Sequence, residues 1–290
     1  MHRKDTDMKI PFQIDLSNKV VVVTGGGGVL CSSFAEAIAQ CGAKVAVVDL
    51  NGDAANKVAD IINNNGGCAI GVSANVLEKK SLEDAKKIIN DSLGQVDILI
   101  NGAGGNNPKG TTSNDYYNPD DENIEGIKTF FDLDPQGIEF VFNLNFLGTL
   151  LPTQVFAHDL IGKKESCIIN ISSMNAFTPL TRIPAYSGAK AAISNFTQWL
   201  AVHFSKVGLR VNAIAPGFFL TNQNRGLLID ENGNYTARSQ KILSQTPMER
   251  FGSTDELIGT LLYLLNYDAS SFVTGIVIPV DGGFSAYSGV

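Results

Sequence analysis

Short apolar runs and amphipathic stretches alternate along almost the whole chain. The apolar runs are typical of parallel strands buried on both faces, and they lie at 19–24, 44–49, 69–72, 96–101, 167–172, 210–214 and 276–280. The stretches between them repeat apolar residues at helical spacing, at 32–40, 54–64, 82–92, 134–159, 186–205 and 254–265. Because such alternation builds a parallel sheet covered on both faces, the pattern predicts a doubly wound α/β fold with about seven strands.

The chain shows no internal repeat and no linker, so we expect one domain over residues 1–290. Its charged first residues lack the apolar core of a signal peptide, and we expect a mobile tail at 1–9. A polar segment at 105–128, rich in Asn, Asp, Gly and Pro, interrupts the alternation. Long ordered loops often cover binding sites, so this insertion is a candidate substrate cover. A disordered loop or a subunit contact is the alternative.

Four consecutive glycines, at 25–28, follow the first apolar run and precede the helix at 32–40. A strand, a glycine turn and a helix N-terminus together can hold a pyrophosphate through backbone N–H groups. The candidates for these contacts are Gly25, Gly27, Gly28, Val29 and Leu30. The segment therefore predicts a dinucleotide site, with a simple tight turn as the alternative.

The second apolar run ends at Asp49, about 20 residues beyond the glycines. A carboxylate at this place would bind the adenosine ribose hydroxyls and repel a 2′-phosphate. The acid therefore predicts NAD(H) rather than NADP(H) as the cofactor, unless Asp49 only caps a neighbouring helix.

Ser173, Tyr186 and Lys190 form the main catalytic candidate. Tyr186 and Lys190 are four residues apart on a predicted helix, so both can point at one spot. A free phenol has a pKa of about 10, and we expect the neighbouring ammonium group to lower it toward the working range. A serine hydroxyl nearby can hold a substrate oxygen. The three residues can therefore move a proton on or off an alcohol or carbonyl, which is one half of a hydride transfer.

These motifs, in this order, resemble the short-chain dehydrogenase/reductase family over nearly the whole chain. The family's Y-x-x-x-K matches Tyr186 and Lys190, its serine matches Ser173 and its catalytic asparagine matches Asn145. The family's N-x-A-G segment, its P-G segment and its C-terminal D-G-G segment match residues 101–104, 216–217 and 281–283. The resemblance implies a Rossmann fold, an NAD cofactor, a role for Asn145 in supporting Lys190 through a water molecule, and a homotetramer built on the helices at 134–159 and 186–205.

Further cofactor contacts are expected along these motifs. Besides the glycine turn, Asp49, Tyr186 and Lys190, the candidates are Asn75, Val76, Asn101, Ala103, Gly104, Pro216, Gly217, Phe219 and Thr221.

Three positions in two motifs depart from the family's pattern. Val29 and Cys31 stand where the family's first motif has its second and third glycines, and Gly102 stands where the N-x-A-G segment usually has a second asparagine. A valine cannot adopt a positive φ without strain, so we expect Gly27 and Gly28 to make the close approach to the cofactor.

Several segments resemble the D-mannonate oxidoreductase (fructuronate reductase) branch of the family, among them NGAGGNNPKGTT, TPLTRIPAYS and DGGFSAYSGV. This resemblance implies interconversion of a keto-sugar acid and its alcohol, with D-fructuronate and D-mannonate as the expected pair. Arg182 could bind the substrate carboxylate, and Asn175 could bind another substrate oxygen. The alternatives are another polyol or keto-acid such as a ketogluconate, and a dinucleotide-binding regulator without turnover.

Composition narrows the functional classes further. The net charge of −7 argues against nucleic acid as a partner, and no apolar run reaches the roughly 18 residues of a membrane span. The four cysteines form no C-x-x-C pair, and the three histidines join no metal-like cluster. These features predict a cytoplasmic enzyme that acts on a small molecule and needs no metal ion. We expect it to bind neither a membrane nor a nucleic acid.

Overall fold

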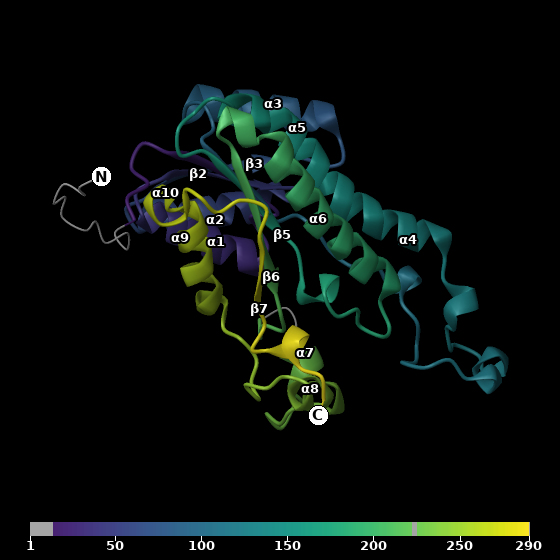
Figure 1. Ribbon diagram of the computed structural model, residues 1–290. Coiled ribbons are helices and arrows are strands. Elements are labelled where there is room, and N and C mark those ends of the chain that lie inside the picture. Colours follow the sequence, from purple (N-terminus) through teal and green to yellow (C-terminus); the bar gives the residue numbers. More distant parts are fainter. Residues whose placement is uncertain (1–13, 222–224, 290) are drawn as a thin grey trace, which may run out of the picture.

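One parallel sheet of seven strands forms the centre of the fold (Figure 1). The computed structural model describes residues 14–221 and 225–289. The strand order is β3-β2-β1-β4-β5-β6-β7, so the sheet grows to one side of β1 with β2 and β3 and to the other side with β4 to β7. The strands are β1 (Val20–Thr24), β2 (Lys44–Asp49), β3 (Cys68–Ser73), β4 (Ile98–Asn101), β5 (Cys167–Ile171), β6 (Arg210–Pro216) and β7 (Val277–Val280). The predicted doubly wound α/β fold is confirmed.

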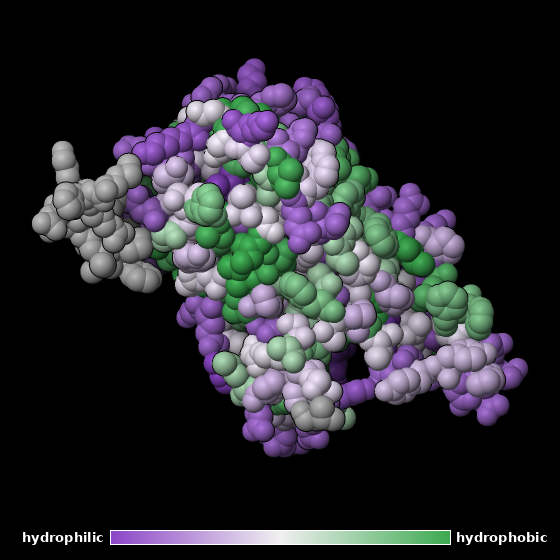
Figure 2. All heavy atoms as spheres, viewed as in Figure 1, coloured by the Kyte–Doolittle hydropathy of each residue, from purple (hydrophilic) through white to green (hydrophobic). Residues whose placement is uncertain are grey.

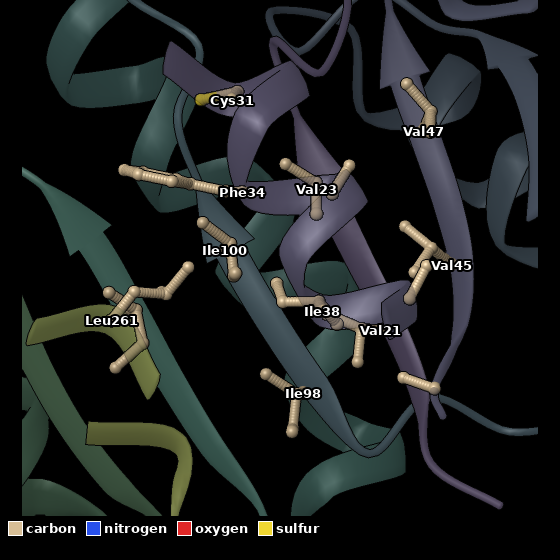
Figure 3. Close-up of a cluster of buried hydrophobic side chains, with 14 of the residues drawn as sticks. Val21, Val23, Cys31, Phe34, Ile38, Val45, Val47, Ile98, Ile100 and Leu261 are labelled. Atoms are coloured by element: carbon tan, nitrogen blue, oxygen red, sulfur yellow. The ribbon is translucent and has the colours of Figure 1, made fainter. Parts of the chain in front are cut away.

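Helices cover both faces of this sheet. One face carries α1 (Val29–Gln40), α2 (Gly52–Asn64) and α9 (Ile258–Leu265), which enclose a core that includes Val21, Val23, Phe34, Ile38 and Leu261 (Figure 3). The other face carries α3 (Lys79–Ser92), α5 (Gly148–Leu160) and α6 (Pro184–His203) over a second core. Burying two continuous apolar layers is the main driving force for this arrangement. It fixes the carboxyl ends of the strands along one edge, where the site lies.

The predicted elements agree with the structure except at some ends. The helix expected at 32–40 begins three residues earlier, so Val29 and Cys31 lie in its first turn. The helix expected at 134–159 is divided into α4 (Pro135–Phe142), a π-helical turn (Asn143–Leu147) and α5. The segment expected at 254–265 begins with a 3₁₀ turn before α9. Three short helices complete the fold: α7 (Arg225–Leu228), α8 (Ala237–Ser244) and α10 (Tyr267–Ser270).

The insertion at 105–128 contains two 3₁₀ turns, Pro108–Gly110 and Pro119–Asn123, and extends away from the sheet beside α4 (Figure 1). The tail predicted at 1–9 lies outside the described residues.

The continuous helical stretch Pro135–Leu160 is long and apolar enough to cross a membrane by length and composition alone. It lies within the α/β fold, however, where α5 packs on α3 and α4 packs on α6. Its two halves therefore pack as helices of this α/β fold.

Candidate active site

The glycine turn brings the N-terminus of α1 to the carboxyl edge of the sheet. Gly25 has a φ of +64°, and a Cβ on it would lie 2.9 Å from backbone atoms of Ala103. Gly28 is extended and caps α1 without a side-chain hydrogen bond. The first N–H groups of the helix, on Val29, Leu30 and Cys31, have no partner within the helix and carry the positive end of its dipole. This cradle fits a pyrophosphate.

The expected close approach of Gly27 and Gly28 needs one refinement. The left-handed backbone is carried by Gly25, whereas a Cβ on Gly27 would lie 2.8 Å from Ala54 Cβ and 3.1 Å from Asp49 Oδ2. Gly27 is thus a glycine because it faces the end of β2. Val29 needs no positive φ, since it already lies in the helix.

Asp49 lies beside the glycine turn. Its Oδ2 accepts a hydrogen bond from Gly27 N at 3.0 Å, and its Oδ1 accepts one from Asn51 N at 2.9 Å. The residue that caps α2 is Asn51. Asp49 is therefore held at the rim of the cradle, where a ribose would lie.

Cys31 fills the space beside Gly102. Cys31 is 4% exposed, and a Cβ on Gly102 would overlap its sulfur. Burial raises the pKa of the Cys31 thiol to about 12, so the group stays neutral. The departures at Cys31 and Gly102 are therefore one packing arrangement. The sequence alone did not reveal it, because the two positions are far apart in the chain.

The N-x-A-G segment is held by two polar networks. Thr24 Oγ1 accepts hydrogen bonds from Gly102 N at 3.1 Å and Ala103 N at 3.4 Å. The side chain of Asn101 turns inward, where its Nδ2 donates to Thr153 Oγ1 at 3.0 Å and to Asn170 Oδ1 at 2.9 Å. Asn101 thus positions the strand end from within the core.

The remaining cofactor candidates surround the same edge. Asn75 uses its side chain within its own turn, accepting from Leu77 N and donating to Glu78. Val76 is buried against Gly148. Gly217 donates to Val280 O at 2.9 Å and directly follows Pro216 at the end of β6.

Phe219 is buried, and its ring lies against Gly252. Thr221 follows at the end of this segment and is half-buried.

Ser173, Tyr186 and Lys190 meet at the carboxyl edge, as predicted. A hydrogen bond joins Ser173 to Tyr186 and lowers the tyrosine pKa, but burial outweighs it and raises the pKa of Tyr186 to about 12. Lys190 Nζ lies 5.5 Å from the Tyr186 ring centroid and donates to Ile171 O at 2.8 Å. Burial lowers the pKa of Lys190 to about 8.

The expectation that the pKa of Tyr186 falls toward the working range is therefore wrong for the protein alone, because loss of solvation penalises the phenolate more than its neighbours favour it.

Asn145 lies in the π-helical turn that divides the long helix. Its Nδ2 donates to Gly105 O at 2.7 Å and to Val141 O at 2.8 Å. A Cβ on Gly104 would lie 2.7 Å from Asn145 Oδ1 and 3.2 Å from Lys190 Nζ, so both side chains border Gly104. A π-helical turn often marks a functional site. Here it turns the asparagine toward the start of the insertion.

The two substrate candidates differ in their surroundings. Asn175 is 4% exposed, and its Oδ1 has no hydrogen-bond partner in the described residues. Arg182 is exposed, and its Nε donates to Thr112 O at 3.0 Å. Within the described residues, no group of three His, Cys, Asp or Glu side chains could hold a metal ion.

Known proteins with similar sequences identify the family of this chain. Residues 19–232 match the short chain dehydrogenase family. An uncharacterized oxidoreductase of Haemophilus influenzae is 60% identical and is aligned over 98% of this chain and 99% of that protein. The uncharacterized oxidoreductase UxuB of Bacillus subtilis is 52% identical, over 97% of this chain and 100% of that protein.

A solved structure agrees with the fold. A Haemophilus protein, provisionally assigned as a D-mannonate oxidoreductase, was solved with bound NAD and is 60% identical. The two structures superpose with a TM-score of 0.93, over 97% of this chain and 100% of that one. The chain therefore belongs to the short-chain dehydrogenase family, and it is an oxidoreductase that uses NAD.

Proposed function

We propose that this enzyme interconverts a keto-sugar acid and its alcohol, with D-fructuronate and D-mannonate as the pair. The observation that carries the proposal is the meeting of Ser173, Tyr186 and Lys190 beside a polar substrate segment that includes Arg182 and Asn175. The 60% identity to a protein provisionally assigned to the same reaction supports it.

The chain's own residues account for the proton half of the reaction. Ser173 donates a hydrogen bond to the substrate carbonyl oxygen and orients it toward Tyr186. Tyr186 holds its proton firmly, because burial raises its pKa to about 12, and it gives that proton to the oxygen as negative charge develops there. Lys190, fixed by Ile171 O, lies close enough for its charge to favour the resulting phenolate. NADH bound along the glycine turn would supply the hydride.

The sugar-acid carboxylate needs a cation, because an unpaired carboxylate is costly to bury. Arg182 is the candidate. The hydrogen bond from its Nε to Thr112 O holds the guanidinium against the insertion, and the planar group can still present its terminal nitrogens to a carboxylate. Asn175 Oδ1, buried without a partner in the described residues, is suited to accept a hydrogen bond from a sugar hydroxyl.

We also propose that the enzyme is a cytoplasmic homotetramer. Exposed apolar side chains of α6 support self-association: Trp199 is 55% exposed and Val202 is 77% exposed, and the Trp199 ring stacks on His203 with the ring centroids 4.5 Å apart. Exposed apolar surface of this kind marks interaction sites. Light scattering coupled to size exclusion would measure the oligomeric state, and a monomer at micromolar concentration would contradict this part of the proposal.

Turnover with a panel of keto-sugar acids, followed through NADH absorbance, tests the proposed activity. We expect D-fructuronate to have the highest kcat/KM, with ketogluconates and uncharged keto-sugars below it. Tyr186→Phe is the matched control for contaminating reductases. NADH binding without turnover of any member would favour a regulator, and a higher kcat/KM for a ketogluconate would replace the proposed substrate.

A further inference from the structure

The first half of the insertion follows the catalytic segment in the opposite direction. Four contacts mark this course, and as the chain advances from 104 to 115 its partners move back from 190 to 181. Gly104 lies beside Lys190, Gly110 lies beside Ala185, Thr112 is hydrogen-bonded to Arg182, and Asp115 is hydrogen-bonded to Thr181. Two hydrogen bonds join Thr112 and Arg182: Thr112 N donates to Arg182 O, and Arg182 Nε donates to Thr112 O, both at 3.0 Å. The insertion is therefore a wall of the substrate site.

Asp115 joins this wall to two other segments. One carboxylate oxygen accepts a hydrogen bond from Thr181 Oγ1 at 2.9 Å, and the other forms an ion pair with Lys241 Nζ on α8. Lys241 holds the pKa of the Asp115 carboxyl below its usual value, with a further contribution from Thr181, so the group is ionised near neutral pH. One side chain thus links the insertion, the loop before Tyr186 and α8.

The contacts of Asp115 belong to a ring of interactions around the loop that follows Ser173. Thr178 Oγ1 donates to Ser285 O at 3.5 Å, which ties this loop to the C-terminal turn. That turn is bonded to the segment after α8, since Met248 N donates to Gly282 O at 3.1 Å. Lys241 on α8 then meets Asp115, which returns to Thr181. Figure 2 shows an opening in the surface where the lobe of α7 and α8 meets the insertion.

We propose that the Asp115–Lys241 pair closes the outer end of the substrate site and so restricts the enzyme to short, polar ketones. This proposal rests on the proposed function. A long apolar substrate would have to extend between α8 and the insertion, where the ion pair stands. Lys241 is 63% exposed and Asp115 is 27% exposed, so the pair is partly solvated and weak enough to open for substrate entry.

Charge exchange tests the pair. The variants are Asp115→Lys, Lys241→Glu and the double variant that carries both, with Asp120→Asn as the control, because Asp120 is an exposed acid of the same insertion outside the ring. The measurement is the ratio of kcat/KM for a bulky aryl ketone to that for D-fructuronate. Each single variant should raise this ratio at least about tenfold. The double variant should return it to within about threefold of the starting value, and Asp120→Asn should leave it unchanged.

A second measurement separates this proposal from the proposed substrate. Hydrogen exchange of the backbone amides at 112–113 and 237–244 should accelerate in each single variant and recover in the double variant. If D-fructuronate is not reduced, the substrate proposal fails, and the best small keto-acid of the panel replaces it in the ratio. An unchanged ratio in both single variants overturns the proposal, even where exchange accelerates. A ratio that the double variant leaves as high as the single variants overturns it as well, because the effect would then not depend on pairing.

Discussion

Gly102→Ala tests whether one packing arrangement at positions 31 and 102 supports the cofactor cradle. A Cβ at 102 would overlap Cys31 Sγ and lie 2.8 Å from Thr24 O. The carbonyl belongs to β1 and cannot retreat, and Cys31 is only 4% exposed, so its sulfur has little space to enter. Inserting a group into a well-packed region costs about 1–3 kcal/mol, and we expect the upper end of that range here.

Cys31→Gly in the same chain should recover part of this loss. It removes the overlap with sulfur, but it leaves the 2.8 Å contact with Thr24 O and places a glycine in the first turn of α1, which costs about 1 kcal/mol by itself. The two changes should therefore couple favourably by about 1–2 kcal/mol. Urea unfolding of the unmutated protein, of each single variant and of the double variant measures this coupling. Gly259→Ala is the control, since nothing lies within 4 Å of a Cβ added there.

NADH binding provides an independent measurement of the same perturbation. Gly102 precedes Ala103, whose backbone lies 2.9 Å from a Cβ built on Gly25, so a shift at 102 reaches the glycine turn. We expect Gly102→Ala to weaken NADH binding about tenfold, roughly the loss of one hydrogen bond, in a fluorescence titration. Additive stability changes, within about 0.5 kcal/mol, would refute the reasoning, because the sulfur would then not occupy the space in question.

Four further predictions concern the chemistry of the site. Tyr186→Phe should lower kcat at least about a hundredfold in steady-state assays and leave NADH affinity nearly unchanged, since general acid catalysis is worth about 10²–10⁴; near-normal turnover would remove Tyr186 from the mechanism. NADH should be preferred over NADPH by a factor on the order of 10, and Asp49→Ala should narrow the difference in kcat/KM; equal values before mutation would show that Asp49 does not contact the ribose. Arg182→Lys should raise the KM for D-fructuronate at least about tenfold and that for an uncharged keto-sugar much less; equal losses would mean that Arg182 acts only by holding Thr112. Without cofactor, the unfolded chain keeps the Lys190 proton between pH 8 and 10.5, while the folded protein releases it. The free energy of unfolding, measured in urea titrations relative to that of Lys190→Met, should therefore rise with pH by up to about 3 kcal/mol. A difference in unfolding free energy that stays constant over this pH range would contradict the lowered pKa of Lys190.

The strands were predictable because a parallel strand covered on both faces needs a continuous apolar run, and such runs are visible without any long-range information. The π-helical turn was not, and its Asn145 donates a hydrogen bond to Gly105, 40 residues away, which no local pattern contains. The course of the insertion was not predictable either, because it also depends on contacts between residues far apart in the sequence. Asp115 and Lys241 are 126 residues apart, and neither lies in a motif that would pair them.

The meeting of Ser173 with Tyr186 was predictable from spacing, since a strand end and a helix start fix both positions. The pKa of Tyr186 was not, because it depends on how much water the folded chain leaves around the ring. Arg182 was expected at the site as a carboxylate ligand, and the structure adds a hydrogen bond to Thr112 that no local pattern contains.

The raised pKa of Tyr186 suits ketone reduction. A phenol with a pKa of about 12 keeps its proton through neutral pH, and an alkoxide is a stronger base than a phenolate, so the proton still moves once negative charge has formed on the substrate oxygen. Alcohol oxidation needs the opposite state, a phenolate, which burial penalises and the charge of Lys190 favours. Lys190 has a pKa of about 8, so it is mostly charged at pH 7. Burial and the ammonium group thus act on one proton in opposite senses, and their sum sets the protonation state in which Tyr186 meets the substrate.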